Sequence, residues 1–106
     1  MKLNVGERGL LTGLLPKEGD FDTLKVLHEL RMSLGFSDEE RQQIVFSNYE
    51  NPDGGMGTRW QNNIVADIPI TKSGMRIIED MLIDLNKKKK LPSEAFTLYE
   101  KFIEDA

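Results

Sequence analysis

The stretch NPDGGMGTRW, residues 51–60, combines closely spaced glycines with the only tryptophan of the chain. Glycines spaced this way cradle phosphate groups when they join a strand to a helix and precede a lysine and a hydroxyl residue. Here no Gly-Lys-Ser/Thr triplet occurs, the dinucleotide spacing is missing, and a strand pattern follows the loop. Pro52, Asp53 and Gly54 are instead typical of a tight turn. The stretch therefore predicts a hairpin connection, which as an exposed loop can still contact a partner.

The titratable residues offer little catalytic or metal chemistry. His28 is the only histidine, and neither further metal ligands nor a nucleophile stand in register with it. Cysteine is absent, which excludes disulfides, thiolate catalysis and the common structural zinc sites. The plentiful carboxylates lie opposite the apolar stripes of the expected helices, where a solvated face explains them. We therefore expect no enzymatic activity, no cofactor and no metal site. An unrecognised enzyme stays a third possibility, because carboxylate chemistry leaves weak traces in a sequence.

A run of four lysines is the strongest charge cluster. Such a run can contact an anion or nucleic acid, and it also complements the negative end of a preceding helix. Because no arginine or aromatic residue is interleaved with it and acidic residues flank it, a solvated loop between two helices is the favoured interpretation. The candidate nucleic-acid contacts are Arg41, Lys87, Lys88, Lys89 and Lys90.

Four residues around the glycine loop have the composition of a protein interface: Tyr49, Met56, Arg59 and Trp60. Aromatic residues, methionine and arginine are enriched at the centres of protein–protein interfaces. We predict that these four residues bind a partner. The competing interpretation is that Trp60 packs inward with Ile64, as the parity of the strand pattern allows.

Five helices are expected to position these residues. The first spans residues 5–15, where Asn4 and Glu7 have the spacing of a capping box. Three glycines interrupt it at positions 6, 9 and 13, which weakens the helix or marks a face that another backbone approaches closely.

The segment DTLKVLHELRMSL predicts the second helix, capped by Asp20 or Asp22 and ended by Gly35 in the left-handed conformation. Ser37 and Glu40 repeat the capping-box spacing and begin a short third helix.

From Ile44 onward the hydrophobic period changes from 3.6 to 2 over the segment IVFSNY. After the glycine loop, one parity is shared by Trp60, Ile64, Ala66, Ile68 and Ile70. We expect a hairpin or three-stranded meander with one buried face. Because proline cannot donate to a ladder, the strand that reaches Pro69 lies at an edge of the sheet or ends there.

Two helices follow the strands. The segment TKSGMRIIEDMLIDLN predicts one with Asn86 as its C-cap, and Pro92 and Ser93 begin the other. The apolar stripe expected on the last helix consists of Phe96, Tyr99, Phe102 and Ile103. The predicted class is α+β, with a small antiparallel sheet packed against four to five helices in the order ααα-ββ(β)-αα, in one domain over residues 1–106.

Composition narrows the class of protein further. Hydrophobic residues make up 39% of the chain, charged residues 30%, and the net charge is -4. This balance favours solubility and gives no long-range attraction to nucleic acid or to an anionic membrane. No run approaches the roughly 18 apolar residues that span a bilayer, and the first residues lack a signal-peptide pattern. We expect a soluble protein of the cytoplasm with no membrane association.

Two segments, LLPKEGDFDTLKVLHELRMSLGFSDEE and LYEKF, resemble a family of small uncharacterised proteins encoded by phages and prophages of Gram-positive bacteria. This sequence departs from the family pattern at Gly6, Gly9 and Gly13, where larger helix formers are expected. The resemblance implies no enzyme, no cofactor and no established site residues. It indicates an accessory protein that acts on a host or phage partner in the bacterial host cell.

The function predicted from these features is a non-enzymatic phage or prophage accessory protein that binds a host or phage protein or self-associates. The alternative is a winged helix-turn-helix-like regulator that binds nucleic acid, because three helices followed by a hairpin have that order. A recognition helix should be basic, whereas the third helix begins with three acidic residues. Only Arg41, Gln42 and Gln43 are left to contact bases, so the sequence favours a protein partner.

Overall fold

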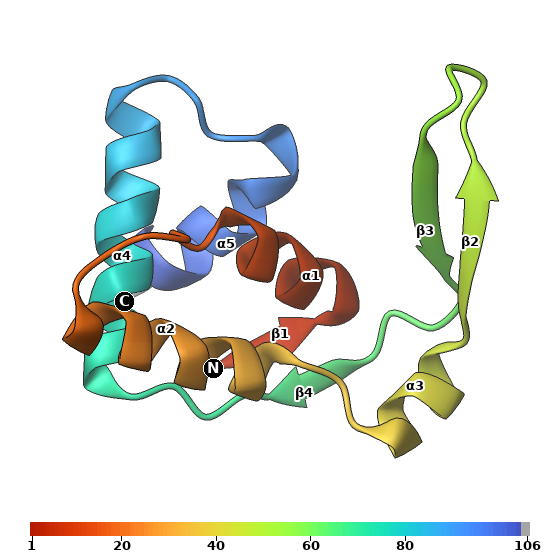
Figure 1. The fold of residues 1–106 in the computed structure, drawn as a ribbon, viewed down its shortest axis with the longest axis horizontal. Coiled ribbons are helices and arrows are strands. Elements are labelled where there is room, and N and C mark those ends of the chain that lie inside the picture. Colours follow the sequence, from red (N-terminus) through yellow and green to blue (C-terminus); the bar gives the residue numbers. More distant parts are fainter. Residues whose placement is uncertain (105–106) are drawn as a thin grey trace.

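The computed structural model describes residues 1–104 and has the α+β class that the sequence predicts (Figure 1). Its elements are β1 (Lys2–Asn4), α1 (Val5–Leu14), α2 (Phe21–Leu34), α3 (Asp38–Ile44), β2 (Phe46–Glu50), β3 (Met56–Trp60), β4 (Val65–Asp67), α4 (Lys72–Lys87), the 3₁₀ turn η1 (Ser93–Ala95), α5 (Phe96–Tyr99) and the π-helical turn η2 (Glu100–Glu104).

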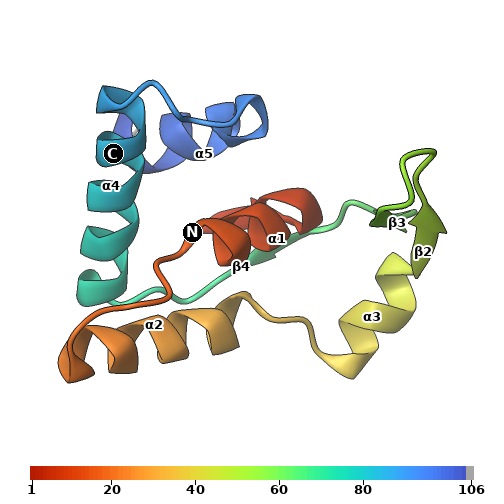
Figure 2. The same ribbon diagram turned by 45° about the horizontal axis from the view of Figure 1, so that its top comes forward.

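The helices α1, α2 and α4 and the segment from η1 to η2 pack around one hydrophobic core (Figure 2). Three predicted helix starts are confirmed, because Asn4, Asp20 and Ser37 each cap a helix with their side chain. Leucine and isoleucine dominate the buried cluster, which consists of Leu3, Leu11, Leu15, Leu27, Leu30, Leu34, Ile68, Ile78, Leu82, Leu98 and Phe102.

The strands form two separate two-stranded antiparallel sheets, not the single sheet that was predicted. One is the predicted hairpin of β2 and β3. The other pairs β1 with β4, so that Leu3 lies opposite Ala66 beneath the helices. The sequence did not predict β1, because three residues are too few to show an alternating pattern and their partner lies more than sixty positions away.

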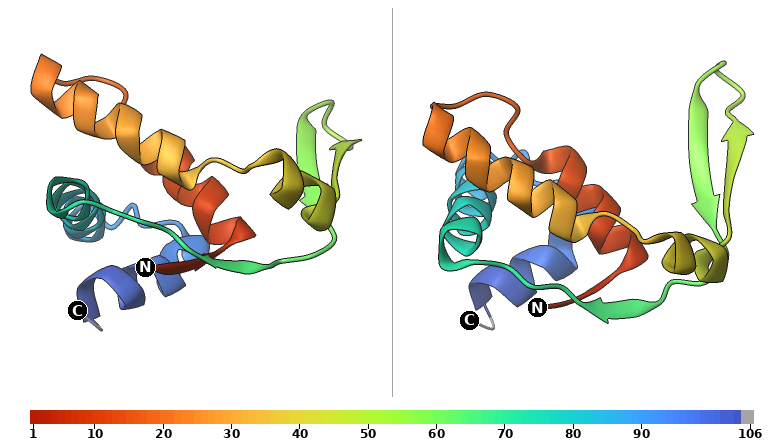
Figure 3. Two further views of the ribbon diagram at one scale, coloured as in Figure 1. Left: turned by 90° about the horizontal axis from the view of Figure 1, so that it is seen from below. Right: turned by 60° about the horizontal axis from the view of Figure 1, so that its bottom comes forward.

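The expectation of one continuous buried face from Trp60 to Ile70 is therefore wrong. Asn62 and Asn63 separate β3 from β4: the Asn62 side chain donates to Gln43 O at 2.6 Å, and the Asn63 side chain accepts from the Gly6 amide at 3.2 Å. These two polar anchors end β3 at Trp60, so the hairpin diverges from the sheet that covers the core (Figure 3).

The end of α2 is held by Arg8 rather than by a left-handed glycine. Gly35 has φ -67°, so the predicted left-handed cap is wrong. Arg8 is only 1% exposed; its Nε donates to Leu34 O at 3.1 Å and its guanidinium also donates to Gly35 O. The guanidinium lies 4.1 Å from the centroid of the Phe36 ring and pairs with Glu40 at 2.6 Å. Arg8 thus joins α1, the end of α2 and the start of α3.

The lysine run closes α4. The helix continues past Asn86, so the predicted C-cap is wrong. Lys89 adopts φ 57°, its amide donates to Asn86 O at 3.1 Å, and the Lys90 amide donates to Leu85 O at 2.9 Å. These bonds form a Schellman motif with a lysine at the position that glycine usually occupies.

The last helical segment differs from the prediction at its start, while Tyr99, Phe102 and Ile103 pack against the core as predicted. Phe96 was expected inside the core but is exposed, whereas Ala95 and Leu98 are buried. The 3₁₀ turn η1 sets this phase, because it places Ala95 three residues before Leu98 on the inner side. Phe102 is buried as predicted.

Candidate functional site

The β2–β3 hairpin stands apart from the helical body in all three ribbon views (Figures 1–3). Its loop confirms the predicted turn. The Gly54 amide donates to Asn51 O at 2.9 Å, the Asn51 amide donates to Gly55 O at 2.6 Å, and Gly54 has φ 89°. This is a three-residue hairpin loop whose last residue must be left-handed, which explains the glycine at position 54.

The register of the hairpin divides the four predicted partner-binding residues between its two faces. Trp60 lies opposite Phe46 and Met56 lies opposite Glu50, and all four share one face. Tyr49 lies on the other face together with Arg59, whose guanidinium is 4.2 Å from the centroid of the Tyr49 ring. The structure therefore brings Tyr49 and Arg59 into contact, whereas Met56 and Trp60 share the other face at opposite ends of β3.

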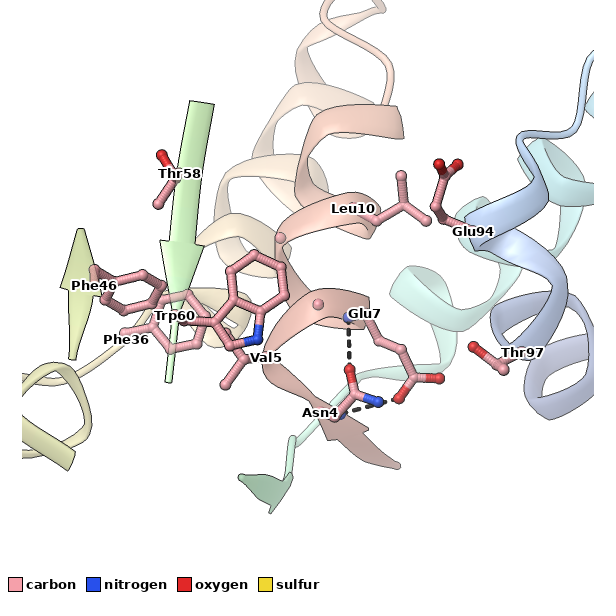
Figure 4. Close-up of a pocket in the computed structure, with 12 residues that line it drawn as sticks. Asn4, Val5, Glu7, Leu10, Phe36, Phe46, Thr58, Trp60, Glu94 and Thr97 are labelled. Atoms are coloured by element: carbon pink, nitrogen blue, oxygen red, sulfur yellow. Dashed lines mark hydrogen bonds between the residues drawn. The ribbon is translucent and has the colours of Figure 1, made fainter. Parts of the chain in front are cut away.

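A groove with a volume of about 520 Å³ lies between the Trp60 face of the hairpin and the start of α1 (Figure 4). Its volume falls within the roughly 300–1,000 Å³ of typical ligand pockets. Side chains from α1, the α2–α3 connection and the hairpin give it an apolar lining, which includes Val5, Leu10, Phe36, Phe46 and Trp60. Figure 4 shows the indole of Trp60 reaching from β3 towards α1.

The glycines of α1 shape this groove. A Cβ atom on Gly6 would lie 3.2 Å from Cζ2 of Trp60, so the glycine lets the indole rest against the helix. A Cβ atom on Gly9 would meet nothing within 4 Å, because Gly9 lines the open part of the groove. The predicted approach of another backbone to this helix is therefore wrong: at Gly6 the approaching group is the Trp60 side chain. A Cβ on Gly13 would also meet open space, but this residue does not line the groove.

The charged side chains that line the groove are both acidic, Glu7 and Glu94. Glu7 is only 4% exposed; its Oε1 accepts from Lys101 Nζ at 2.7 Å and from the Asn4 amide at 3.0 Å. Its Oε2 is buried. Burial raises the pKa of Glu7, but the hydrogen bonds from Lys101 and Asn4 outweigh it and hold the pKa below its usual value. The Thr97 side chain also helps to lower the pKa of this carboxylate.

The candidate nucleic-acid contacts do not form one surface. Arg41 lies on α3, next to the hairpin, whereas Lys87–Lys90 close α4 at the opposite end of the molecule in Figures 1 and 2. Lys88 pairs with Asp84 at 3.0 Å. The histidine, His28, is exposed on α2. No group of three or more metal-ligating side chains comes together within the described residues.

Comparisons with known proteins add no family. No protein-family model matches the chain, and neither a curated protein nor a solved structure shows significant similarity to it. In the part of the chain that the structure describes, no helix is both long enough and apolar enough to cross a membrane.

Sequence reasoning missed most of the groove. Phe36, Phe46, Glu94 and Thr97 come from separate segments, and no local pattern connects them. The one sequence signal was the pair of glycines three residues apart in α1, which share a helix face.

Proposed function

We propose that this protein is a non-enzymatic accessory protein that acts by binding another protein through the groove and the hairpin beside it. The observation that carries this proposal is a hairpin with little cover on either face. Met56 is 70% exposed and Trp60 is 39% exposed. Two-stranded hairpins are marginally stable in water unless something packs against them. A partner seated in the groove would supply that packing.

The proposed setting follows from the resemblance described above. Residues 14–40 and 98–102 resemble phage and prophage proteins, which supports a role on a host or phage protein in the bacterial cytoplasm. Self-association is the second form that such an interaction can take. A nucleic-acid partner is the alternative. Two observations disfavour it: its candidate contacts lie far apart on this molecule, and the first turn of α3 is acidic.

The test is affinity capture of the tagged protein from bacterial lysate, with and without nuclease, read by mass spectrometry. We expect one dominant protein that survives nuclease treatment and is lost with Trp60→Ala. Phe21→Ala is the matched control, because Phe21 is an equally apolar residue, 80% exposed, at the start of α2 outside the groove. Arg59→Ala tests the opposite face of the hairpin.

Two results would overturn the proposal. Loss of the captured proteins after nuclease treatment would indicate that the protein binds nucleic acid. Arg41 and Lys87–Lys90 would then be the next residues to change. Equal capture by wild type, Trp60→Ala and Phe21→Ala would remove the groove from the function. Circular dichroism of each variant separates loss of binding from loss of folding.

A further inference from the structure

The groove side of the hairpin presents an unpaired strand edge. Because the Asn51 amide donates to Gly55 O and bonded pairs alternate along an antiparallel ladder, the bonded pairs of the hairpin are Tyr49–Gly57 and Ser47–Arg59. The backbone N–H and C=O groups of Met56, Thr58 and Trp60 therefore point away from β2. Within residues 1–104 these groups take part in no further backbone hydrogen bond.

This edge borders the groove, which lies on the Trp60 face of the hairpin. In each ribbon view β3 is the strand nearer to α1, and β2 is the outer strand (Figures 1–3). Thr58 and Trp60 both line the groove. β3 lacks a proline or a charged side chain beside the groove that would hinder its pairing with another strand. Its single charged residue, Arg59, stacks on Tyr49 at the other face.

We propose that the groove binds an extended, basic segment of the partner protein, which adds to the free edge of β3 as a third strand. This inference rests on the proposed function and names the chemistry of the partner. Backbone hydrogen bonds to Met56, Thr58 and Trp60 hold such a segment, and every second side chain enters the groove on the face of Trp60. An added strand matching the five residues of β3 spans about 17 Å.

Charge complementarity selects a basic segment. Among the residues that the structure describes, the groove lining contains two carboxylates, of Glu7 and Glu94, and no lysine, arginine or histidine. Glu7 is already paired with Lys101 at 2.7 Å, so the negative charge of the lining that has no ion pair within residues 1–104 is that of Glu94. A lysine or arginine of the partner pairs with Glu94, while apolar side chains cover the rings of Trp60 and Phe46.

The space for these side chains lies over Gly9, where a Cβ atom meets nothing within 4 Å. A leucine at this position fills the groove without contacting the core, and it favours the helix over glycine. Gly13, one helical turn later and equally open, offers a matched control outside the groove. The two substitutions therefore change helix propensity alike and differ in whether they block the groove.

The probe is a displayed library of random octapeptides selected on the intact protein. We expect the selected peptides to alternate apolar residues with others and to carry lysine or arginine. Titration of a selected synthetic peptide should shift the emission of Trp60, the only tryptophan, to shorter wavelength. Gly9→Leu should weaken binding about tenfold and Gly13→Leu should leave it unchanged. Methylation of alternate backbone amides of the peptide should also cost about tenfold, because it removes the donors to β3.

Other outcomes overturn strand addition. Selected peptides with helical spacing of apolar residues, or with acidic residues, would assign the groove to a different occupant, as would binding that survives Gly9→Leu. A dimer of the protein alone, seen by light scattering and abolished by Gly9→Leu, would assign the edge to a second copy. If lysate capture yields a Trp60-dependent partner but the library yields no extended basic peptide, the proposed function stands and strand addition fails. If capture yields no partner, the proposed function fails.

Discussion

Substitution of Arg8 by methionine should destabilise the fold more than any change at an exposed arginine. The guanidinium donates to the carbonyl oxygens of Leu34 and Gly35, which end α2 without the bonds of a left-handed cap. It also pairs with Glu40 at the start of α3. Methionine fills much of the same volume and can still pack on the Phe36 ring, so the change removes mainly the hydrogen bonds.

The magnitude follows from the partners that are left behind. The buried Leu34 carbonyl that loses its donor costs about 1–3 kcal/mol, and the Gly35 carbonyl costs less because water can reach it. Glu40 reaches solvent and is rehydrated, so its loss adds less than that of a fully buried partner. We expect Arg8→Met to lower the free energy of unfolding by about 3 kcal/mol, at the lower end of the roughly 3–5 kcal/mol measured for broken buried pairs.

The assay is urea unfolding followed by circular dichroism, with Arg41→Met as control because Arg41 is exposed on α3. Hydrogen exchange supplies a second readout: α3 and the hairpin should lose protection first, because Arg8 ties α3 to α1. A loss below about 1 kcal/mol, or one equal to that of Arg41→Met, would refute the assignment of the α2 cap to Arg8.

Three further predictions test the charges and backbone conformations described above. The Arg8 side chain and the Ser37 amide lower the pKa of Glu40 from 4.5 to about 2. The contribution of Glu40 to the free energy of unfolding is therefore complete above pH 4.5 and is lost as the pH falls towards 2. Urea unfolding between these two pH values should show that Glu40→Gln loses less stability than wild type. Lys89→Gly should raise the free energy of unfolding by about 1 kcal/mol, because φ 57° is strained for lysine, and an unchanged urea midpoint would contradict this. Val45→Gly should raise the free energy of unfolding by about as much, because Val45, which links α3 to β2, is a β-branched residue at φ 58°. A lower urea midpoint for this variant would show that the contacts of the valine side chain contribute more than its backbone strain costs.

The local parts of the fold were predictable because their causes lie within a few residues. Asn4 and Glu7 bond each other's backbone amides across one helical turn, and Ser37 and Glu40 do the same. The turn at Gly54 likewise depends on residues 51–55 alone. In each case the side chain that satisfies the backbone is close in the sequence, so residue type and spacing suffice to predict the structure.

Gly35 shows where such reasoning stops. A glycine after a leucine-rich helix predicts a left-handed cap, but the carbonyl oxygens at this end are satisfied by an arginine that precedes them by 26 and 27 residues. The same limit applies to β1, whose partner strand lies near position 66. Both errors concern hydrogen bonds that form only after distant segments have packed together.

Trp60 shows why the candidate site was half predictable. The sequence left two interpretations open, an inward tryptophan and a partner-binding one, and the structure gives a reason for each. One edge of the indole rests against the α1 backbone because position 6 has no side chain, while the rest of the ring lines an open groove. Parity along β3 determines which face Trp60 shares with Met56, but it contains no information about what lies opposite that face. That information resides in Gly6 and Gly9, whose missing side chains leave room between helix and hairpin for the proposed partner.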